Sequence, residues 1–548
     1  MRYLSISLVL CLMSVALLLP PPAVGPKLAV AGRDDQSPVK QPPAELRLSR
    51  ADYVDRVQAV WTAQIAAVLL AWPHEHQTAS VLWLRDYPRE YTAAPVDDDW
   101  YYEMCAIRGF EKYGIGMTAA QLGEQWKENN CGSWGSSEQA LLALRRGIKA
   151  PETGHPRYNK LWFTIGPQFS SEVYGALAPG MPNLAGQLAR EFGHVNGYAE
   201  AVDGAVFMAG MVSLGFVEKD TRAIVKKAAS LIHPTSPYRQ CLDQVITAAE
   251  GGKSFQQVVS QVEDRWHIEY PATNNAVANG GIVAAALWFG KGDFLATVNL
   301  AAGAADFTDA DCNAANAAAV VAAMHGMEAI PRHLVAALGD RIVGDKMGPL
   351  KLTPPVDEKI SDLARRTAAV GVKMLKAYGA KVDDAGIVVR IEEPATQPAE
   401  LFQLADLTKY WNPDWTLERA GFGGAGGGMG GIRGITHLDG DVLATYPRDE
   451  VRGVVLRRTV KLGEKPSLSF RAGVDPGRAW ELNVYVDNKL LSKKIIEAPS
   501  DAKGRHWQAL SFDLTAYAGK LVHLRLYQRV LLPGRTAGNA YWKALVVE

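Results

Sequence analysis

Apolar residues recur at steps of three and four over most of the first 385 positions, a spacing typical of α-helices. The first predicted helix begins at Ala51. An alanine-rich run over 314–324 is apolar almost all round, which predicts a buried helix, and Gly326 suits the end of that helix. Further helices are predicted over 100–113, 184–215 (with a kink near 194–197), 276–289, 331–338 and 354–378.

The hydrophobic period changes to two beyond residue 420. Leu482, Val484 and Val486 alternate with polar neighbours, and 522–526 show the same alternation. Turn signals at 475–477 and Gly519 separate these runs, which predicts short antiparallel strands packed as a β-sandwich. We therefore predict a multidomain chain, with an all-α domain followed by an all-β, jelly-roll-like sandwich.

The length of 548 residues is too great for one hydrophobic core, so more than one domain is expected. We predict a signal peptide over 1–31, a flexible tether over 32–50, and the helical domain over 51–385. A linker that contains Pro394 and Pro398 is predicted over 386–420, before a sandwich over 421–548.

The N-terminus has the pattern of an export signal. An apolar run from Leu4 to Leu19 is shorter than a typical membrane span, and Ala29-Val30-Ala31 resembles a cleavage site. The pattern predicts an exported protein, periplasmic or extracellular, without stable membrane insertion.

Charge and cysteine usage narrow the possible functions. The formal net charge is zero, so nothing favours nucleic acid as a partner. Four cysteines would remain after signal cleavage: Cys105, Cys131, Cys241 and Cys312. They permit two disulfides in three pairings, or four buried thiols. No spacing typical of zinc sites occurs.

Two acidic stretches lie at predicted helix starts. Asp97, Asp98 and Asp99 precede the helix over 100–113. Asp309 and Asp311 precede the alanine-rich helix, with Asp311 at the predicted N-cap. Adjacent carboxylates repel one another unless a cation is present, and oxygen ligands suit Mg²⁺ or Ca²⁺. Solvated helix caps are the alternative interpretation.

Six short stretches follow one another along residues 50–385. They are Pro95-Val96-Asp97-Asp98-Asp99, Ser137-Glu138-Gln139-Ala140-Leu141, Leu144-Arg145-Arg146-Gly147-Ile148, Ala176-Leu177-Ala178-Pro179-Gly180-Met181-Pro182, Gly204-Ala205-Val206-Phe207-Met208-Ala209 and Asp309-Ala310-Asp311-Cys312-Asn313-Ala314-Ala315. Together and in this order they resemble the ADP-ribosylglycohydrolase family, in its Asp-Thr-Asp-Cys-Asn branch. The resemblance implies an all-α fold and a Mg²⁺-dependent hydrolase that cleaves an N- or O-glycosidic bond to a ribosyl group.

The resemblance also implies roles for particular residues. The five aspartates, Asp97, Asp98, Asp99, Asp309 and Asp311, would hold one or two Mg²⁺ ions, and Asp98 or Asp99 would activate water. Substrate contacts are implied for Glu75, His194, and Asn274 or Asn275. Each of these has a structural alternative: Glu75 as an exposed residue after a helix, His194 as a structural histidine, and either asparagine as a helix cap.

Some residues depart from the family pattern. Trp100 and Ala310 stand where threonine is common, and Cys312 stands where two-metal members often use a threonine hydroxyl. A thiol is a poor ligand for Mg²⁺, so the number of ions stays open.

The substrate also stays open. The alternatives to a ribosyl-bond hydrolase are an exported hydrolase of other glycans and an inactive binding protein on the same fold. The C-terminal region resembles a galactose-binding-like jelly roll, the usual shape of carbohydrate-binding modules. It would therefore bind carbohydrate or, alternatively, only pack against the helical domain.

Overall fold

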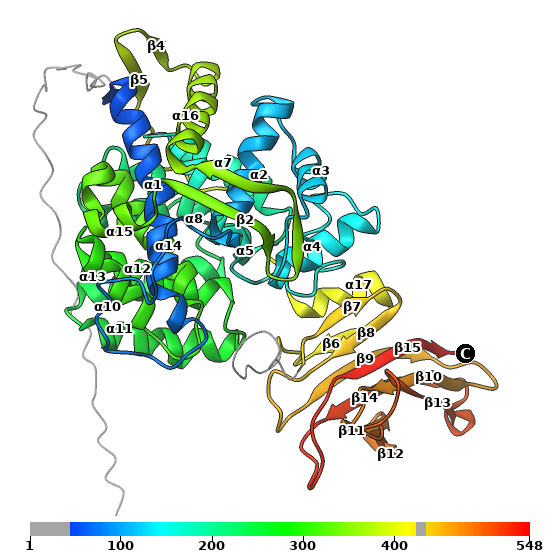
Figure 1. The fold of residues 1–548 in the computed structure, drawn as a ribbon. Helices are drawn as coiled ribbons and strands as arrows, with labels where there is room; N and C mark the ends of the chain where they lie inside the picture. The colour runs from blue at the N-terminus through cyan, green and yellow to red at the C-terminus, as the bar shows by residue number, and fades with distance from the viewer. Residues whose placement is uncertain (1–43, 423–433) are drawn as a thin grey trace, which may run out of the picture. The chain divides into compact units, whose positions relative to one another are not determined.

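Helix α14 (Ala310–His325) is the alanine-rich run, and every residue from Ala310 to Met324 is buried. It packs along α1 (Arg50–Ala71), whose second half is equally buried (Figure 1). Small side chains on both helices allow close packing of their backbones, so neither helix needs a polar face over this length.

The computed structural model describes residues 44–422 and 434–548. The predicted signal peptide over 1–31, and residues 32–43 of the predicted tether, lie outside the described residues. Within the described residues, no helix is both long and apolar enough to cross a bilayer.

Other helices surround this central pair, and their order follows the chain. They are α2 (Asp98–Tyr113), α3 (Ala119–Asn129), α4 (Gly135–Arg145), α5 (Gly166–Phe169), α6 (Glu172–Leu177), α7 (Pro182–Gly193), α8 (Glu200–Gly215), α9 (Thr221–Ala229), α10 (Pro237–Glu250), α11 (Phe255–Val262), α12 (Ala276–Gly290), α13 (Phe294–Gly303), α15 (Arg332–Ala337) and α16 (Ile360–Ala377). The predicted all-α character of this domain is confirmed, with α8 and α12 also buried on almost every side.

Short strands accompany the helices. Strand β1 (Glu45–Leu48) pairs with β5 (Gly386–Arg390), which also pairs with β4 (Lys381–Asp383). Strands β2 (Arg341–Met347) and β3 (Leu350–Lys359) form an antiparallel hairpin.

The hairpin corrects one helix prediction and α14 corrects another. The helix predicted over 354–378 begins only at Ile360, because Pro354 and Pro355 lack the N–H that a helix interior requires and favour the extended β3. The N-cap of α14 is Asp309, not Asp311, since the backbone is already helical from Ala310 onward.

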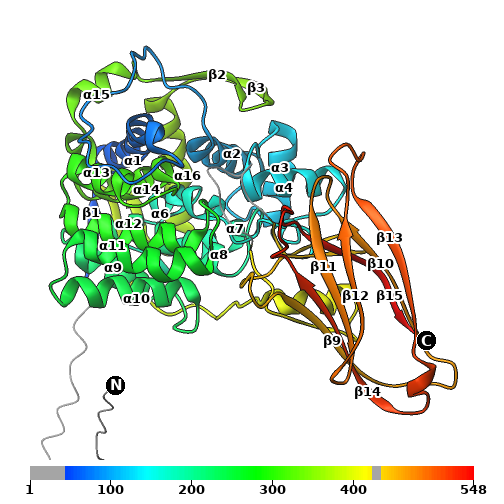
Figure 2. The same cartoon turned by 90° about the horizontal axis from the view of Figure 1, so that it is seen from below.

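The C-terminal region is an antiparallel β-sandwich, as its period-two pattern predicted (Figure 2). One sheet has the order β13-β10-β15-β8-β7 and the other β12-β11-β14-β9-β6. The strands are β6 (Thr416–Glu418), β7 (His437–Asp439), β8 (Val442–Thr445), β9 (Val454–Lys461), β10 (Ser467–Val474), β11 (Ala479–Val486), β12 (Lys489–Glu497), β13 (His506–Asp513), β14 (Leu521–Arg529) and β15 (Ala540–Val547). Inward-facing side chains such as Trp480, Trp542 and Leu482 form its core.

Residues 386–420, predicted as a linker, contain ordered elements. Besides β5 they include α17 (Leu407–Trp411) and β6, and Leu407 is buried in the core of the sandwich. Between them, Glu400 accepts hydrogen bonds from the helical domain. The cysteines, whose state the sequence left open, are four buried free thiols.

Candidate active site

The N-termini of α2 and α14 bring the two acidic stretches together. Asp97 caps α2, where its side chain accepts a hydrogen bond from the backbone N–H of Asp99. Asp309 occupies the same position before α14. The Cys312 thiol donates to Oδ2 of Asp99 at 3.4 Å, so the first turns of the two helices meet.

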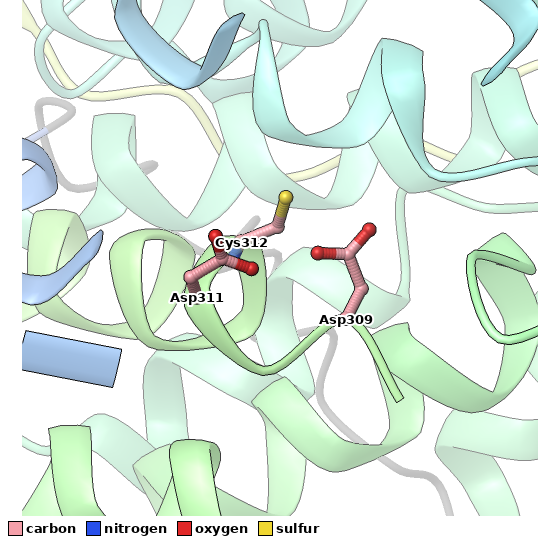
Figure 3. Close-up of side chains that lie close together, drawn as sticks. All are labelled: Asp309, Asp311 and Cys312. Carbon is pink, nitrogen blue, oxygen red and sulfur yellow. The ribbon is translucent and has the colours of Figure 1, made fainter. Parts of the chain in front are cut away.

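In each stretch, the side-chain atoms that could bind a metal ion lie close together. Asp97, Asp98 and Asp99 offer three such atoms within 4.8 Å of one another, and so does the set of Asp309, Asp311 and Cys312. Figure 3 shows that the two carboxylates and the thiol of the second set lie together at the start of α14.

Both stretches border one cavity of about 340 Å³. Its acidic wall residues are Glu75, Asp97, Asp98, Asp309 and Asp311. Trp72 and Trp134 also line it, and they are 49% and 43% exposed. No lysine or arginine occurs among the described residues that line this cavity, so its carboxylates face one another without a strong cationic partner.

Burial and mutual repulsion raise the pKa values of these carboxyl groups. Burial raises the pKa of Asp97 to about 6. Burial, and then the charges of Asp97 and Asp309, raise the pKa of Asp98 well above its usual range. Burial followed by the charge of Glu75 does the same to the pKa of Asp311. A bound cation would reverse these shifts because it favours the ionised form of each carboxyl group.

Two buried carboxylate oxygens, Oδ1 of Asp99 and Oδ1 of Asp309, have no hydrogen-bond partner among the described residues. A buried unpaired oxygen is costly, so two of them from facing helix starts fit a hard cation that prefers oxygen ligands. The Cys312 thiol fits such a cation poorly. Burial raises the pKa of this thiol well above its usual range, so it stays protonated and donates to Asp99.

Two asparagines hold Asp309 in position. The side-chain amide of Asn274 donates to Oδ2 of Asp309 at 2.5 Å. Oδ1 of Asn279 accepts from the backbone N–H of Asp309 at 3.2 Å and from Asn313 at 2.7 Å. The loop before α12 therefore orients the carboxylate that caps α14.

Replacing Asn274 by alanine is expected to weaken Mg²⁺ binding about 10- to 100-fold, the usual cost of removing a group that orients a metal ligand. Isothermal titration of Mg²⁺ measures this change. Asn488→Ala, in the turn between β11 and β12, is the matched control and should bind Mg²⁺ like the unmodified protein. An unchanged affinity in Asn274→Ala would contradict the orienting role.

The loop after α1 adds Glu75 and His76 to the cavity. Nε2 of His76 lies 2.9 Å from Oε1 of Glu75, and the backbone N–H of His76 donates to Thr308. Burial lowers the pKa of His76, but the hydrogen bond to Glu75 and the charge of Asp309 outweigh burial and raise it. Sequence reasoning selected Glu75 and missed His76, for which adjacency to Glu75 was the only signal.

The cavity has further walls that sequence reasoning did not single out. Ser136, Ser137 and Thr164 contribute hydroxyl groups. Ser137 accepts a hydrogen bond from Asn196 at 2.9 Å, whereas Oγ of Ser136 has no partner among the described residues. Ser137 belongs to a stretch that carried the family resemblance, which was the available signal.

Two predicted substrate-binding residues do not line this cavity. Nδ1 of His194 lies 2.6 Å from the carbonyl oxygen of Arg190, and Nε2 lies 3.0 Å from Glu400. Its contacts therefore join the segment around Glu400 to the helical domain. Asn275 is buried and caps α12 by accepting from the N–H of Ala278, so of the two asparagines only Asn274 faces the acidic residues.

One turn after Asp99, α2 carries the fully buried Glu103. Its carboxyl oxygens accept from the backbone N–H of Val173 at 2.7 Å and from the side-chain amide of Gln64 at 3.1 Å. It is also hydrogen-bonded to Glu172, another fully buried carboxyl group. Burial, and then the charge of Glu172, raise the pKa of Glu103 well above its usual range, and burial raises the pKa of Glu172 to about 8. The hydrogen bond between them raises the pKa of Glu103 and lowers that of Glu172, so Glu103 is the donor in this pair.

The profile of the family described as ADP-ribosylglycohydrolase matches residues 49–373. A solved structure described as an "ADP-ribosylglycohydrolase-related protein complex" is 17% identical and has a TM-score of 0.41, over 59% of this chain and 99% of that chain. Another, described as "CBM4 structure and function", is 16% identical with a TM-score of 0.17, over 25% of this chain and 88% of that chain.

No curated protein matches the chain. The family profile nevertheless spans more than half of the sequence and contains both acidic helix starts. This chain therefore belongs to the ADP-ribosylglycohydrolase family.

Proposed function

We propose that this protein is a Mg²⁺-dependent glycohydrolase that cleaves an N- or O-glycosidic bond to a ribosyl group. One observation carries the proposal. Carboxylates from two helix starts meet at a cavity that has no lysine or arginine among the described residues that line it. Oδ1 of Asp309, a residue of this lining, and Oδ1 of the adjoining buried Asp99 have no hydrogen-bond partner among the described residues. This arrangement is costly for stability and useful for holding a cation, which is typical of a functional site.

Asp99, Asp309 and Asp311 are the residues that would hold the cation, with the other aspartates of the cluster beside them. When bound, Mg²⁺ supplies charge that orients sugar hydroxyls or phosphate oxygens and lowers the pKa of water. Asp98 lines the cavity and would take a proton from the attacking water as the bond to the anomeric carbon opens. Trp72 and Trp134 offer aromatic faces that orient the substrate and exclude bulk water.

We also propose that the protein is exported and that its sandwich binds carbohydrate. The predicted signal peptide over 1–31 supports export, and the β-sandwich fold supports a binding module by analogy of shape.

Chelation of Mg²⁺ is expected to slow release of free ADP-ribose from an ADP-ribosylated peptide by at least about 100-fold, since a catalytic metal contributes several kcal/mol. Chromatographic measurement of ADP-ribose with Mg²⁺, with EDTA, and with Mg²⁺ restored tests this. The same preparation is assayed for reducing sugars released from neutral and acidic glycans.

The products distinguish the candidate activities. ADP-ribose release that depends on Mg²⁺ supports the ribosyl linkage. Sugar release without ADP-ribose would show a hydrolase of other glycans, and Mg²⁺ binding without any product would show an inactive binding protein.

A further inference from the structure

A second cavity, of about 740 Å³, lies between the helical domain and the sandwich and is strongly basic. The cations in its lining are Arg145, Arg146, Arg157, Lys160 and Arg505. Asp439 is the one carboxylate among its described lining residues, and it is paired with Arg505 at 2.9 Å. The excess of positive charge is local, because the whole chain has a formal net charge of zero.

The remaining cations are not neutralised by carboxylates of the described residues. Arg145 donates to the side-chain oxygen of Asn130, and Arg146 donates to the carbonyl of Leu142. Arg157 lies over the rings of two tyrosines. Exposed cations that outnumber the carboxylates of one concave surface attract an anionic ligand.

A third cavity, of about 380 Å³, shares lining residues with both this basic pocket and the acidic site. It shares Trp134 and Gly135 with the acidic cavity. It shares Gln139, Lys160 and His437 with the basic pocket. The three cavities therefore lie next to one another, and one molecule long enough to reach all three would contact both domains.

The middle cavity has the chemistry of a sugar subsite. Trp134 offers a partly exposed indole, and Asn539 and Glu138 add polar groups. Nδ1 of His437 lies 2.7 Å from the carbonyl oxygen of Ile435 and must donate to it, so Nε2 is an acceptor. Burial lowers the pKa of His437 to about 4, so the ring is neutral at pH 7.

The three neighbouring cavities are called the groove below, and contacts between the two domains fix the positions of its walls. Phe422 packs against Phe163 with ring centroids 4.3 Å apart, and Arg448 pairs with Glu269 at 3.2 Å. Ile435, which lines the middle cavity, belongs to the hydrophobic core of the helical domain. The side of the sandwich that faces the helical domain therefore forms part of the walls of these cavities.

We propose that this groove binds an extended anionic saccharide, with a sugar ring near the acidic cluster and a carboxylate, sulfate or phosphate group in the basic pocket. The inference rests on the proposed function for the sugar at the acidic end, while the anion-binding pocket stands on its own residues. It assigns the sandwich a direct part in substrate binding.

Calorimetric titration of the full chain with tetragalacturonate, its methyl-esterified form and ADP-ribose tests this assignment. The first and last probes carry carboxylates and phosphates, and the ester removes the charge while keeping the sugar chain. We expect an anionic probe to bind at least about 10-fold more tightly than the ester, with affinity that falls as salt rises. Binding of tetragalacturonate alone identifies an acidic glycan, and binding of ADP-ribose alone identifies a nucleotide sugar.

The double variant Arg146→Gln/Lys160→Gln is expected to weaken binding of the anionic probe by about 10-fold or more, since it removes two exposed cations that would donate charge-assisted hydrogen bonds to the anionic group. Both side chains are exposed, so the fold should persist. Arg332→Gln, an exposed arginine outside the three cavities, is the matched control and should bind normally.

Equal affinity for the ester, unchanged affinity in the double variant, or no binding of either anionic probe would overturn the assignment. Binding that depends on Arg146 and Lys160 but yields no product would uphold the pocket and argue against the proposed activity. The two inferences can therefore fail separately.

Discussion

Asp309→Ala should lower kcat for release of the ribosyl product about 10³-fold or more, even at high Mg²⁺ concentration. The substitution removes the carboxylate that brings an unpartnered oxygen from α14 into the cavity, and it leaves the amide of Asn274 without its acceptor. A catalytic metal contributes several kcal/mol, and about 4 kcal/mol corresponds to a 10³-fold change in rate. Steady-state kinetics over a Mg²⁺ series, with calorimetry of Mg²⁺ binding, measure the effect.

Two companion variants separate the loss of a ligand from a loss of fold. Asp309→Asn keeps the shape of the side chain and removes its charge, so it should also lose most activity. Asp384→Ala changes an exposed aspartate between β4 and β5 and should leave kcat unchanged. Retained activity in both Asp309 variants would rule out a catalytic cation held by this residue.

Glu103→Ala is expected to destabilise the protein by roughly 4 kcal/mol. The truncation leaves a cavity and removes the acceptor of the Val173 N–H, the acceptor of the Gln64 amide and the partner of Glu172, all of them buried. Each unsatisfied buried group costs about 1–3 kcal/mol, and a large-to-small core change adds a further penalty. Chemical denaturation followed by circular dichroism measures the loss.

Glu103→Gln is the matched variant and should cost about 1 kcal/mol or less. Because Glu103 is protonated, a neutral amide can donate to Glu172 in its place. The second N–H of the new amide can donate to Oε1 of Gln64 if the Gln64 amide group rotates by about 180°. This oxygen has no partner among the described residues. Equal destabilisation by alanine and glutamine would contradict the assignment of the shared proton to Glu103.

The helices and strands follow mainly from local sequence patterns. The alanine-rich run corresponds to α14, and the period-two pattern of 482–486 corresponds to β11. Both could be recognised because the buried faces of a helix or strand determine which positions along the chain are apolar. The helix predicted from 354 was wrong at its start. There the two prolines and pairing with β2 favoured a strand, which apolar spacing alone does not reveal.

The two acidic stretches were recognisable in the sequence because several adjacent carboxylates at a helix start need an explanation. Their meeting depends on how α2 and α14 pack, and so do the roles of their neighbours. His194 and Asn274 looked equally suitable in the sequence, yet one bonds to Glu400 and the other to Asp309.

Composition and spacing therefore established the two fold classes, the order of the domains and the acidic residues, since each leaves a local signature. Only tertiary packing decided which side chains share a cavity and that His76 faces the aspartates. It also decided that Arg145 and Arg146, at the end of α4, line a cavity together with residues of the sandwich. Those contacts join residues hundreds of positions apart. Such pairs carry no spacing signal along a single chain, because their proximity results from the packing of whole helices and sheets.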